Sequence, residues 1–284
     1  MPDERSLLID SPANPRIRAA VALRERRERE ATGLTLVDGG REARRAIEAG
    51  VDVDTAFVCT ALLTSEEARE AVNALARAWG RRELVAVSER AFEKLAYGDR
   101  ADGIVLVVRP RVRALEGLEL PENPLVVVTE DVEKPGNVGA ILRSADGAGA
   151  DAVIAVGGTD LFNPNVIRAS VGTVFSMPVA AAPVADVVAW LRARGLRIVA
   201  TRVDSRTLHA DADLRGPVAL VLGSEADGLS PAWDPAGGEA IRLPMEGVAD
   251  SLNVSAAAAI LLYEAWRQRR GHAGVTVASP QSGR

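Results

Sequence analysis

The chain has 284 residues, of which 34 are basic and 39 acidic, so its formal net charge is −5. That length suits one large domain or two ordinary ones, and a hydrophobic content of 48% is typical of a soluble globular protein rather than a disordered chain. No apolar run approaches the roughly 20 residues that span a bilayer, and the first residues lack a signal pattern. We therefore expect a cytoplasmic protein with no membrane contact.

Several chemistries are excluded by residue counts. The chain has one cysteine, Cys59, and two histidines, His209 and His272, which exclude a disulfide framework and a Cys/His zinc site. Neither of its two lysines, Lys94 and Lys134, precedes Ser or Thr, so there is no P-loop. The absence of GxGxxG weakens a nicotinamide-dinucleotide interpretation. We expect no metal.

The first half of the chain predicts a small α/β unit. Asn14 caps a predicted helix over 15–31, with Pro15 at its first position. Further helices are predicted over 41–49 and 65–80, and strands over 55–59, 83–88 and 103–108. A stretch rich in Pro and charge then predicts a linker. The expected division is a domain over 1–113, a linker over 114–122, a domain over 123–271 and a loose tail over 272–284.

The second half alternates strands and helices. Apolar β-branched runs predict strands over 125–130, 152–156, 197–202 and 218–223, and helices are predicted over 139–147, 165–171, 184–194 and 253–270. Such alternation predicts a largely parallel sheet with helices on both faces. Loops at the carboxyl ends of such strands are where open parallel sheets bind ligands.

Three of these loops carry candidate functional residues. In the first, Asn137 is positioned to cap the following helix, and Arg143 lies six residues further along it. In the second, Glu225 lies between Gly223 and Gly228. The third enters the long helix with three polar residues, Ser251, Asn253 and Ser255, that suit a helix start. Taken alone, the first two loops are better explained as an ordinary capped helix and an ordinary turn, and for the third the residues leave both interpretations open.

Taken together, the three loops resemble the SpoU/TrmH family of RNA ribose 2'-O-methyltransferases, a branch of the SPOUT superfamily. The matching strings are EKPGNVGAILRSADGAGADAVI, LVLGSEADGLS and LPMEGVADSLNVSAAAAILLYEAWRQR, in the family's order. In NPRIRAAVALRERREREATG, in the helix after DGGREA and in GIVLVV, the first half resembles the family's N-terminal substrate-binding domain, which is similar to an RNA-binding ribosomal protein. Thiostrepton-resistance rRNA methyltransferases share this layout.

The resemblance implies a C-terminal parallel-sheet domain with a trefoil knot that binds S-adenosylmethionine. Carried over to this sequence, the family's contacts with the methyl donor fall on Gly223, Ser224, Leu243 and Leu252. The implied catalytic residues are Arg143, Asn137, Ser251, Asn253 and Glu225. The family assigns activation of the ribose hydroxyl to Arg143. An arginine side chain stays charged in proteins, so electrostatic stabilisation is its safer role.

RNA recognition is expected partly from the first half. Residues 14–29 contain six arginines and two glutamates, a concentration that suits phosphate contacts. The predicted RNA contacts are Asn14, Arg18, Arg24, Arg26, Arg27 and, in the second half, Arg168. The resemblance also implies a homodimer formed through the C-terminal domain.

Four functions remain as alternatives. The favoured one is methylation of large-subunit (23S) rRNA, because the first half resembles a ribosomal RNA-binding fold. The same chemistry on tRNA is the second, and a non-catalytic RNA-binding or ribosome assembly factor is the third. A metabolic α/β enzyme that uses a nucleotide is the most distant. The net acidity lies in the second half, since residues 1–117 carry 20 basic and 20 acidic residues.

Overall fold

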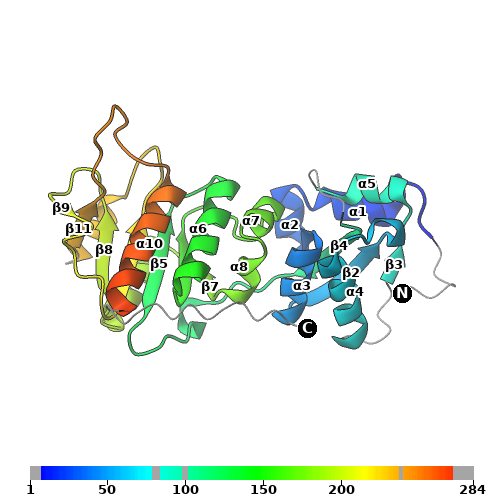
Figure 1. Ribbon diagram of the computed structural model, residues 1–284, viewed down its shortest axis with the longest axis horizontal. Helices are drawn as coiled ribbons and strands as arrows, with labels where there is room; N and C mark the ends of the chain where they lie inside the picture. Colours follow the sequence, from blue (N-terminus) through cyan, green and yellow to red (C-terminus); the bar gives the residue numbers. More distant parts are fainter. Residues whose placement is uncertain (1–7, 79–83, 98–101, 237–238, 271–284) are drawn as a thin grey trace.

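The computed structural model describes residues 8–78, 84–97, 102–236 and 239–270. The two halves of the chain lie side by side along the long axis, each with its own sheet (Figure 1). Both sheets are covered by helices, which confirms the predicted α/β class. None of the helices in these ranges is long and apolar enough to cross a membrane.

The N-terminal sheet has four strands in the order β1-β4-β2-β3. Its central strand β4 is antiparallel to both neighbours, whereas β2 and β3 are parallel. Apolar side chains pack on both faces, with α1 and α5 on one and α3 and α4 on the other. The bounds are β1 Thr35–Asp38, β2 Asp52–Val58, β3 Leu84–Ala86, β4 Ile104–Arg109, α1 Pro15–Ala22, α3 Gly40–Glu48, α4 Glu66–Ala78 and α5 Glu89–Leu95.

The single helix predicted over 15–31 is wrong, because the chain forms two helices, α1 and α2 (Arg26–Thr32). The break lies at residues 23–25, where the buried Arg29 donates from Nη1 to the carbonyls of Leu23 at 2.8 Å and Arg24 at 2.7 Å. These bonds satisfy carbonyls that the helix end leaves free. A side chain six residues away thus stabilises a turn that local periodicity does not reveal.

The C-terminal sheet has seven strands, all parallel, in the order β7-β6-β5-β10-β8-β11-β9, as predicted for this half. Strand β10 lies between β5 and β8 although it follows β8 in the chain. The trefoil knot stays a prediction. The bounds are β5 Leu125–Glu130, β6 Ala152–Val156, β7 Val179–Ala181, β8 Arg197–Thr201, β9 Thr207–Leu208, β10 Val218–Leu222 and β11 Glu239–Arg242.

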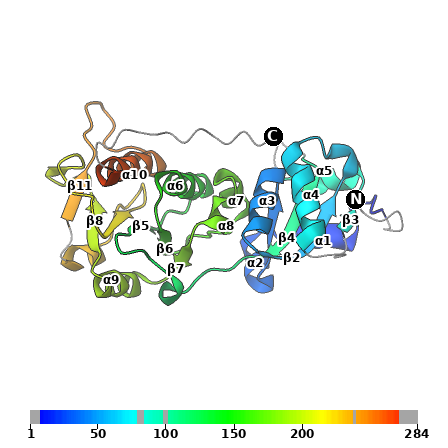
Figure 2. The same ribbon diagram turned by 60° about the horizontal axis from the view of Figure 1, so that its bottom comes forward.

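Helices cover both faces of this sheet. Figure 2 shows α6 (Pro135–Ala148) and α10 (Val254–Arg270) on one side and α9 (Val184–Ala193) on the other. Two short helices, α7 (Pro164–Ala169) and α8 (Thr173–Ser176), lie between the sheet and the N-terminal half. One hydrophobic core therefore continues from the first half into the second.

The predicted linker is partly packed. Leu115 begins the short 3-10 helix Leu115–Gly117 and Leu118 follows it, and both are buried in the core on the α9 side of the sheet. The predicted loose tail over 272–284 lies outside the described residues.

Candidate active site

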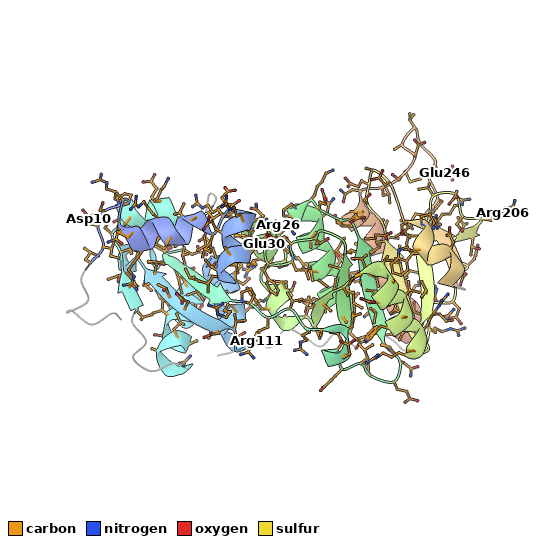
Figure 3. The ribbon with its side chains drawn as sticks, turned by 180° about the vertical axis from the view of Figure 1, so that it is seen from behind. Asp10, Arg26, Glu30, Arg111, Arg206 and Glu246 are labelled. Carbon is orange, nitrogen blue, oxygen red and sulfur yellow. The ribbon has the colours of Figure 1, made fainter. Side chains whose placement is uncertain are left out.

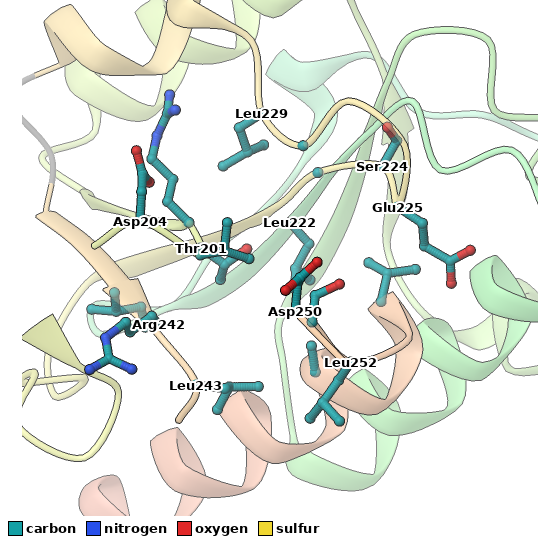
Figure 4. A pocket seen from close by; sticks show the side chains of 18 of the residues that line it. Thr201, Asp204, Leu222, Ser224, Glu225, Leu229, Arg242, Leu243, Asp250 and Leu252 are labelled. Atoms are coloured by element: carbon teal, nitrogen blue, oxygen red, sulfur yellow. The ribbon is translucent and has the colours of Figure 1, made fainter. Parts of the chain in front are cut away.

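A pocket of about 580 Å³ opens at the carboxyl ends of β8, β10 and β11. Its walls are the loops that follow these strands, together with one side of α10 (Figure 4). Because all strands of the sheet are parallel, their carboxyl ends share one edge, and the three loops converge there.

The loop after β10 is a tight turn whose backbone forms part of the wall. A Cβ at Gly223 would lie 2.3 Å from the Gly228 carbonyl oxygen, so only glycine fits. The Ser224 hydroxyl accepts a hydrogen bond from the Asp227 amide at 3.0 Å, and Gly228 has a φ of +69°. The turn is therefore held closed by contacts between its own residues.

All four residues predicted to contact the methyl donor line this pocket: Gly223, Ser224, Leu243 and Leu252. Glu225 and Ser251, predicted as catalytic residues, line it as well. Leu222 and Leu229 add further apolar surface. Apolar walls beside exposed backbone groups suit an adenosine moiety, and the volume lies within the range usual for small-molecule sites.

Beside the pocket, side chains from three loops form a polar cluster. Asn253 Nδ2 lies 2.5 Å from Glu225 Oε1 and 3.1 Å from Asn137 Oδ1, and donates to both. Asn137 Nδ2 donates to Glu225 Oε1 at 3.2 Å, and the Lys134 ammonium pairs with the other carboxylate oxygen. The loops after β5, β10 and β11 are thus joined at one point.

The Lys134 ammonium lowers the pKa of Glu225 below its ordinary value, and the amides of Asn137 and Val254 add to the effect. A carboxylate stabilised in this way stays ionised at neutral pH. Glu225 is therefore a poor proton acceptor and a good hydrogen-bond anchor for the two asparagines.

Of the two asparagines expected at helix starts, only Asn253 is a cap. Helix α6 begins at Pro135, so Asn137 lies inside the first turn and its amide contacts Glu225 rather than capping the helix. Asn253 does cap α10, since its Oδ1 accepts the Ser255 amide at 3.0 Å. Ser251 lies upstream of that cap, in the pocket wall.

Arg143 lies in the third turn of α6, six residues beyond Asn137. In the part of the chain that the structure describes, its side chain is exposed and has no hydrogen-bond or ion-pair partner. It is not among the residues that line the pocket. The guanidinium is free to bind an incoming anion.

Sequence reasoning missed Glu130, a buried carboxylate at the end of β5. It accepts hydrogen bonds from the Ser230 amide at 2.8 Å, the Ser230 hydroxyl at 2.7 Å and Trp233 Nε1 at 3.0 Å. These bonds anchor the end of the loop that contains Gly223 and Glu225. The sequence feature that could have indicated Glu130 is its position as an acidic residue at the end of an apolar strand. Among the described residues no group of His, Cys, Asp and Glu could hold a metal ion.

The residues predicted to contact RNA fall into two sets. Arg18 and Arg27 are exposed, and Asn14 caps α1 by accepting the Arg16 amide at 2.9 Å. The other three make contacts within the protein. Arg24 donates to the carbonyl of Ala96 at 2.8 Å, Arg26 to that of Gly158 at 2.9 Å, and Arg168 to that of Tyr97.

Models of known protein families match both halves of the chain. Residues 124–263 match the SpoU rRNA Methylase family, and residues 14–106 match the MRM3-like substrate binding domain. A 23S rRNA (uridine(2479)-2'-O)-methyltransferase of Streptomyces viridochromogenes is 34% identical over 258 residues, which cover 87% of each chain.

Solved structures of methyltransferases are similar to this protein over nearly the whole chain. An RNA 2'-O ribose methyltransferase is 42% identical with a TM-score of 0.82, covering 93% of this chain and all of that one. The methyltransferase AviRb of S. viridochromogenes, in complex with AdoMet, is 33% identical with a TM-score of 0.81 and covers 91% and 99%. The chain therefore belongs to the SpoU rRNA methylase family.

Proposed function

We propose that this protein transfers a methyl group from S-adenosylmethionine to the 2'-hydroxyl of a ribose in 23S rRNA. The observation that carries the proposal is the pocket of Gly223, Ser224, Leu243 and Leu252 beside the Asn137–Glu225–Asn253 cluster. Relatives named for 23S rRNA 2'-O-methylation match most of the chain, including its substrate-binding half. That shared half favours rRNA over tRNA.

When bound, S-adenosylmethionine supplies a methyl group activated by its sulfonium charge. Transfer forms a bond between the ribose oxygen and the methyl carbon while the carbon–sulfur bond breaks, and the hydroxyl proton leaves to solvent. The protein's task is to orient the hydroxyl and stabilise the charge that develops on its oxygen.

Arg143 is the residue we assign to that charge. Arginine side chains carry a positive charge in proteins, so we assign Arg143 the role of a cation rather than a base. It also suits bidentate contact with the neighbouring phosphate. Asn137 and Asn253, fixed by the Glu225 carboxylate, orient the ribose, and Ser251 shapes the pocket wall beside the methyl group.

We further propose that two copies pair through their C-terminal domains. On α10, Ile260 is 41% exposed and Tyr263 51% exposed, although both are large apolar side chains. A second copy of this surface would cover them. Sedimentation at micromolar concentration is expected to give a dimer, and Ile260→Glu a monomer. A wild-type monomer would contradict the pairing.

The methylation proposal is tested with tritiated S-adenosylmethionine and three purified substrates: 23S rRNA, 16S rRNA and tRNA. We expect label in 23S rRNA alone. Asn253→Ser keeps the helix cap but removes the amide that contacts Glu225 and Asn137, so it is expected to lower the rate without unfolding α10. Label in tRNA would favour the tRNA alternative. Tight binding of the donor without transfer to any RNA would favour the non-catalytic one.

A further inference from the structure

The segment that follows β6, residues 157–163, is held by the N-terminal half of the chain. The Arg29 guanidinium forms an ion pair with Asp160. Arg26 Nη1 donates to the Gly158 carbonyl at 2.9 Å, and the Thr35 hydroxyl donates to the Phe162 carbonyl at 2.7 Å. Figure 3 shows Arg26 and Glu30 at the junction of the two halves. Three side chains from α2 and β1 thus fix one short segment of the catalytic half.

Arg29 is the most constrained of these side chains. Only 7% of it is exposed, and its Nη1 is bound to the carbonyls of Leu23 and Arg24 at the break between α1 and α2. Its ion-pair partner Asp160 is 25% exposed. Removing one partner of a largely buried ion pair is costly. The Arg29–Asp160 pair therefore holds α2 more firmly than an exposed ion pair would.

The same segment is also tied to the loop that enters the candidate active site. The Thr159 hydroxyl donates to the Val132 carbonyl at 3.0 Å, and the Asp131 amide donates to the Val156 carbonyl at 3.0 Å. Asp131 has a φ of +52°, a conformation uncommon outside glycine. Three residues later the chain reaches Lys134 and then Asn137, which join the Glu225 cluster.

An unbroken series of contacts therefore runs from α2 to the loop over residues 131–137, which follows β5. It passes from Arg29 to Asp160, along the backbone to Thr159, and across to Val132. Helix α2 also carries the exposed Arg27, one of the predicted phosphate contacts. The position of α2 relative to the loop that leads to Asn137 is therefore fixed by these contacts.

We propose that Arg29 and Asp160 are positioning residues for methyl transfer. The pair holds α2 in a fixed position relative to the loop over residues 131–137. RNA bound to the N-terminal half is thereby positioned with its ribose against the pocket. The inference rests on the proposed function, since it names how the substrate of that site is aligned.

The test compares Asp160→Ala and Asp160→Asn with the wild-type protein. Both substitutions leave the contacts of Arg29 with Leu23 and Arg24 in place. The measurements are kcat on in-vitro transcribed 23S rRNA, the Kd for that RNA, the Kd for S-adenosylmethionine and the unfolding temperature. Rates are measured well below the lowest unfolding temperature.

Asp160→Ala is expected to lower kcat by at least about 10-fold, since misplacing a bound substrate by about 1 Å can cost about 100-fold. Both Kd values should change by less than about twofold, because neither binding surface is altered. Asp160→Asn, which can still accept a hydrogen bond from Arg29, should recover part of kcat.

The matched control is the ion pair between Arg44 and Glu70, which joins two helices within the N-terminal half at 2.6 Å. Glu70→Ala should leave kcat within about twofold of wild type. An unchanged kcat in Asp160→Ala, even with a lower unfolding temperature, would show a merely structural pair and overturn this inference alone. Wild-type protein that binds S-adenosylmethionine but methylates no rRNA would instead overturn the proposed function.

Discussion

At the scale of single residues, the candidate site contains three side chains that are fixed by hydrogen bonds to one another and one arginine without such a partner among the described residues. Asn137, Glu225 and Asn253 bind one another, and the pKa of Glu225 is lowered by Lys134, so this cluster keeps its charge through neutral pH. The favourable contacts of a carboxylate with a lowered pKa are present above its ordinary pKa and are lost only as pH falls below it. Arg143, in contrast, is exposed and unpaired within the described residues.

Arg143→Ala should therefore abolish methyl transfer while S-adenosylmethionine still binds. Loss of a group that stabilises transition-state charge costs about 100- to 1000-fold in rate. Single-turnover transfer to 23S rRNA and calorimetric titration of the donor measure the two effects separately. Arg143→Lys keeps the charge but not the bidentate geometry and should retain partial activity. Full activity in Arg143→Ala would remove it from the mechanism.

A second residue-scale prediction concerns Asp38, at the end of β1. Burial raises the pKa of Asp38 to about 6, against the hydrogen bond from the Tyr97 amide and the charge of Arg168, which lower it. The nearby Asp102 and Glu42 carboxylates raise it further. The folded state therefore binds this proton more tightly than the unfolded state does.

It follows that the folded state loses stability as pH rises from the ordinary aspartate pKa through about 6. Asp38→Asn removes the buried charge and should stabilise the protein by about 1–3 kcal/mol at neutral pH. Urea unfolding near neutral pH and near pH 4 measures the free energy of unfolding in each state. The gain should be absent in acid, and an equal gain at both pH values would contradict the assignment to this carboxyl.

At the scale of elements, the second half was easier to predict than the first. The runs of residues in β5, β6, β8 and β10 are continuous and β-branched, as buried parallel strands require, and the sequence identified each of them. Short elements such as β1, α5 and β7 were missed, because three to seven residues carry too little periodicity.

The candidate site was predicted residue by residue only through family resemblance. Local rules indicated that Asn137 caps a helix, whereas Pro135 starts the helix earlier and the amide is left for Glu225. Contacts between residues about 90 positions apart, such as this one, have no local signature. The same holds for Glu130 and its bond with Trp233.

Close packing of α6 against α7 gives an element-scale prediction. A Cβ at Gly139 would lie 2.4 Å from the Ala169 Cβ, whereas a Cβ at Gly136 in the same helix meets nothing within 4 Å. Gly139→Ala should destabilise the protein by about 1–3 kcal/mol through overpacking, and Gly136→Ala should be neutral or slightly stabilising. Thermal unfolding of both variants measures the difference, and equal effects would contradict the close approach.

At the scale of the whole molecule, net charge is a poor guide to RNA binding. Of the arginines concentrated in residues 14–29, Arg24, Arg26 and Arg29 contact carbonyls or Asp160 inside the protein. The exposed Arg18 and Arg27 remain available to phosphates. The number of arginines in this stretch therefore overstates how many of them are available to phosphates.

Removing Arg18 and Arg27 together should weaken 23S rRNA binding and lower the slope of log K against log salt by about 1–2. Arg206→Ala, at the far end of the catalytic half (Figure 3), is the control and should leave the slope unchanged. Filter binding across a salt series provides the measurement. An unchanged slope in the double variant would place the RNA footprint on another surface.

The most direct test of the central proposal is mass-spectrometric mapping of methylated ribose in 23S rRNA incubated with S-adenosylmethionine and the protein. We predict one new 2'-O-methyl group with the wild-type protein and none with Arg143→Ala. A methyl group on a base, or no methylation of 23S rRNA by wild-type protein that binds the donor, would contradict the account.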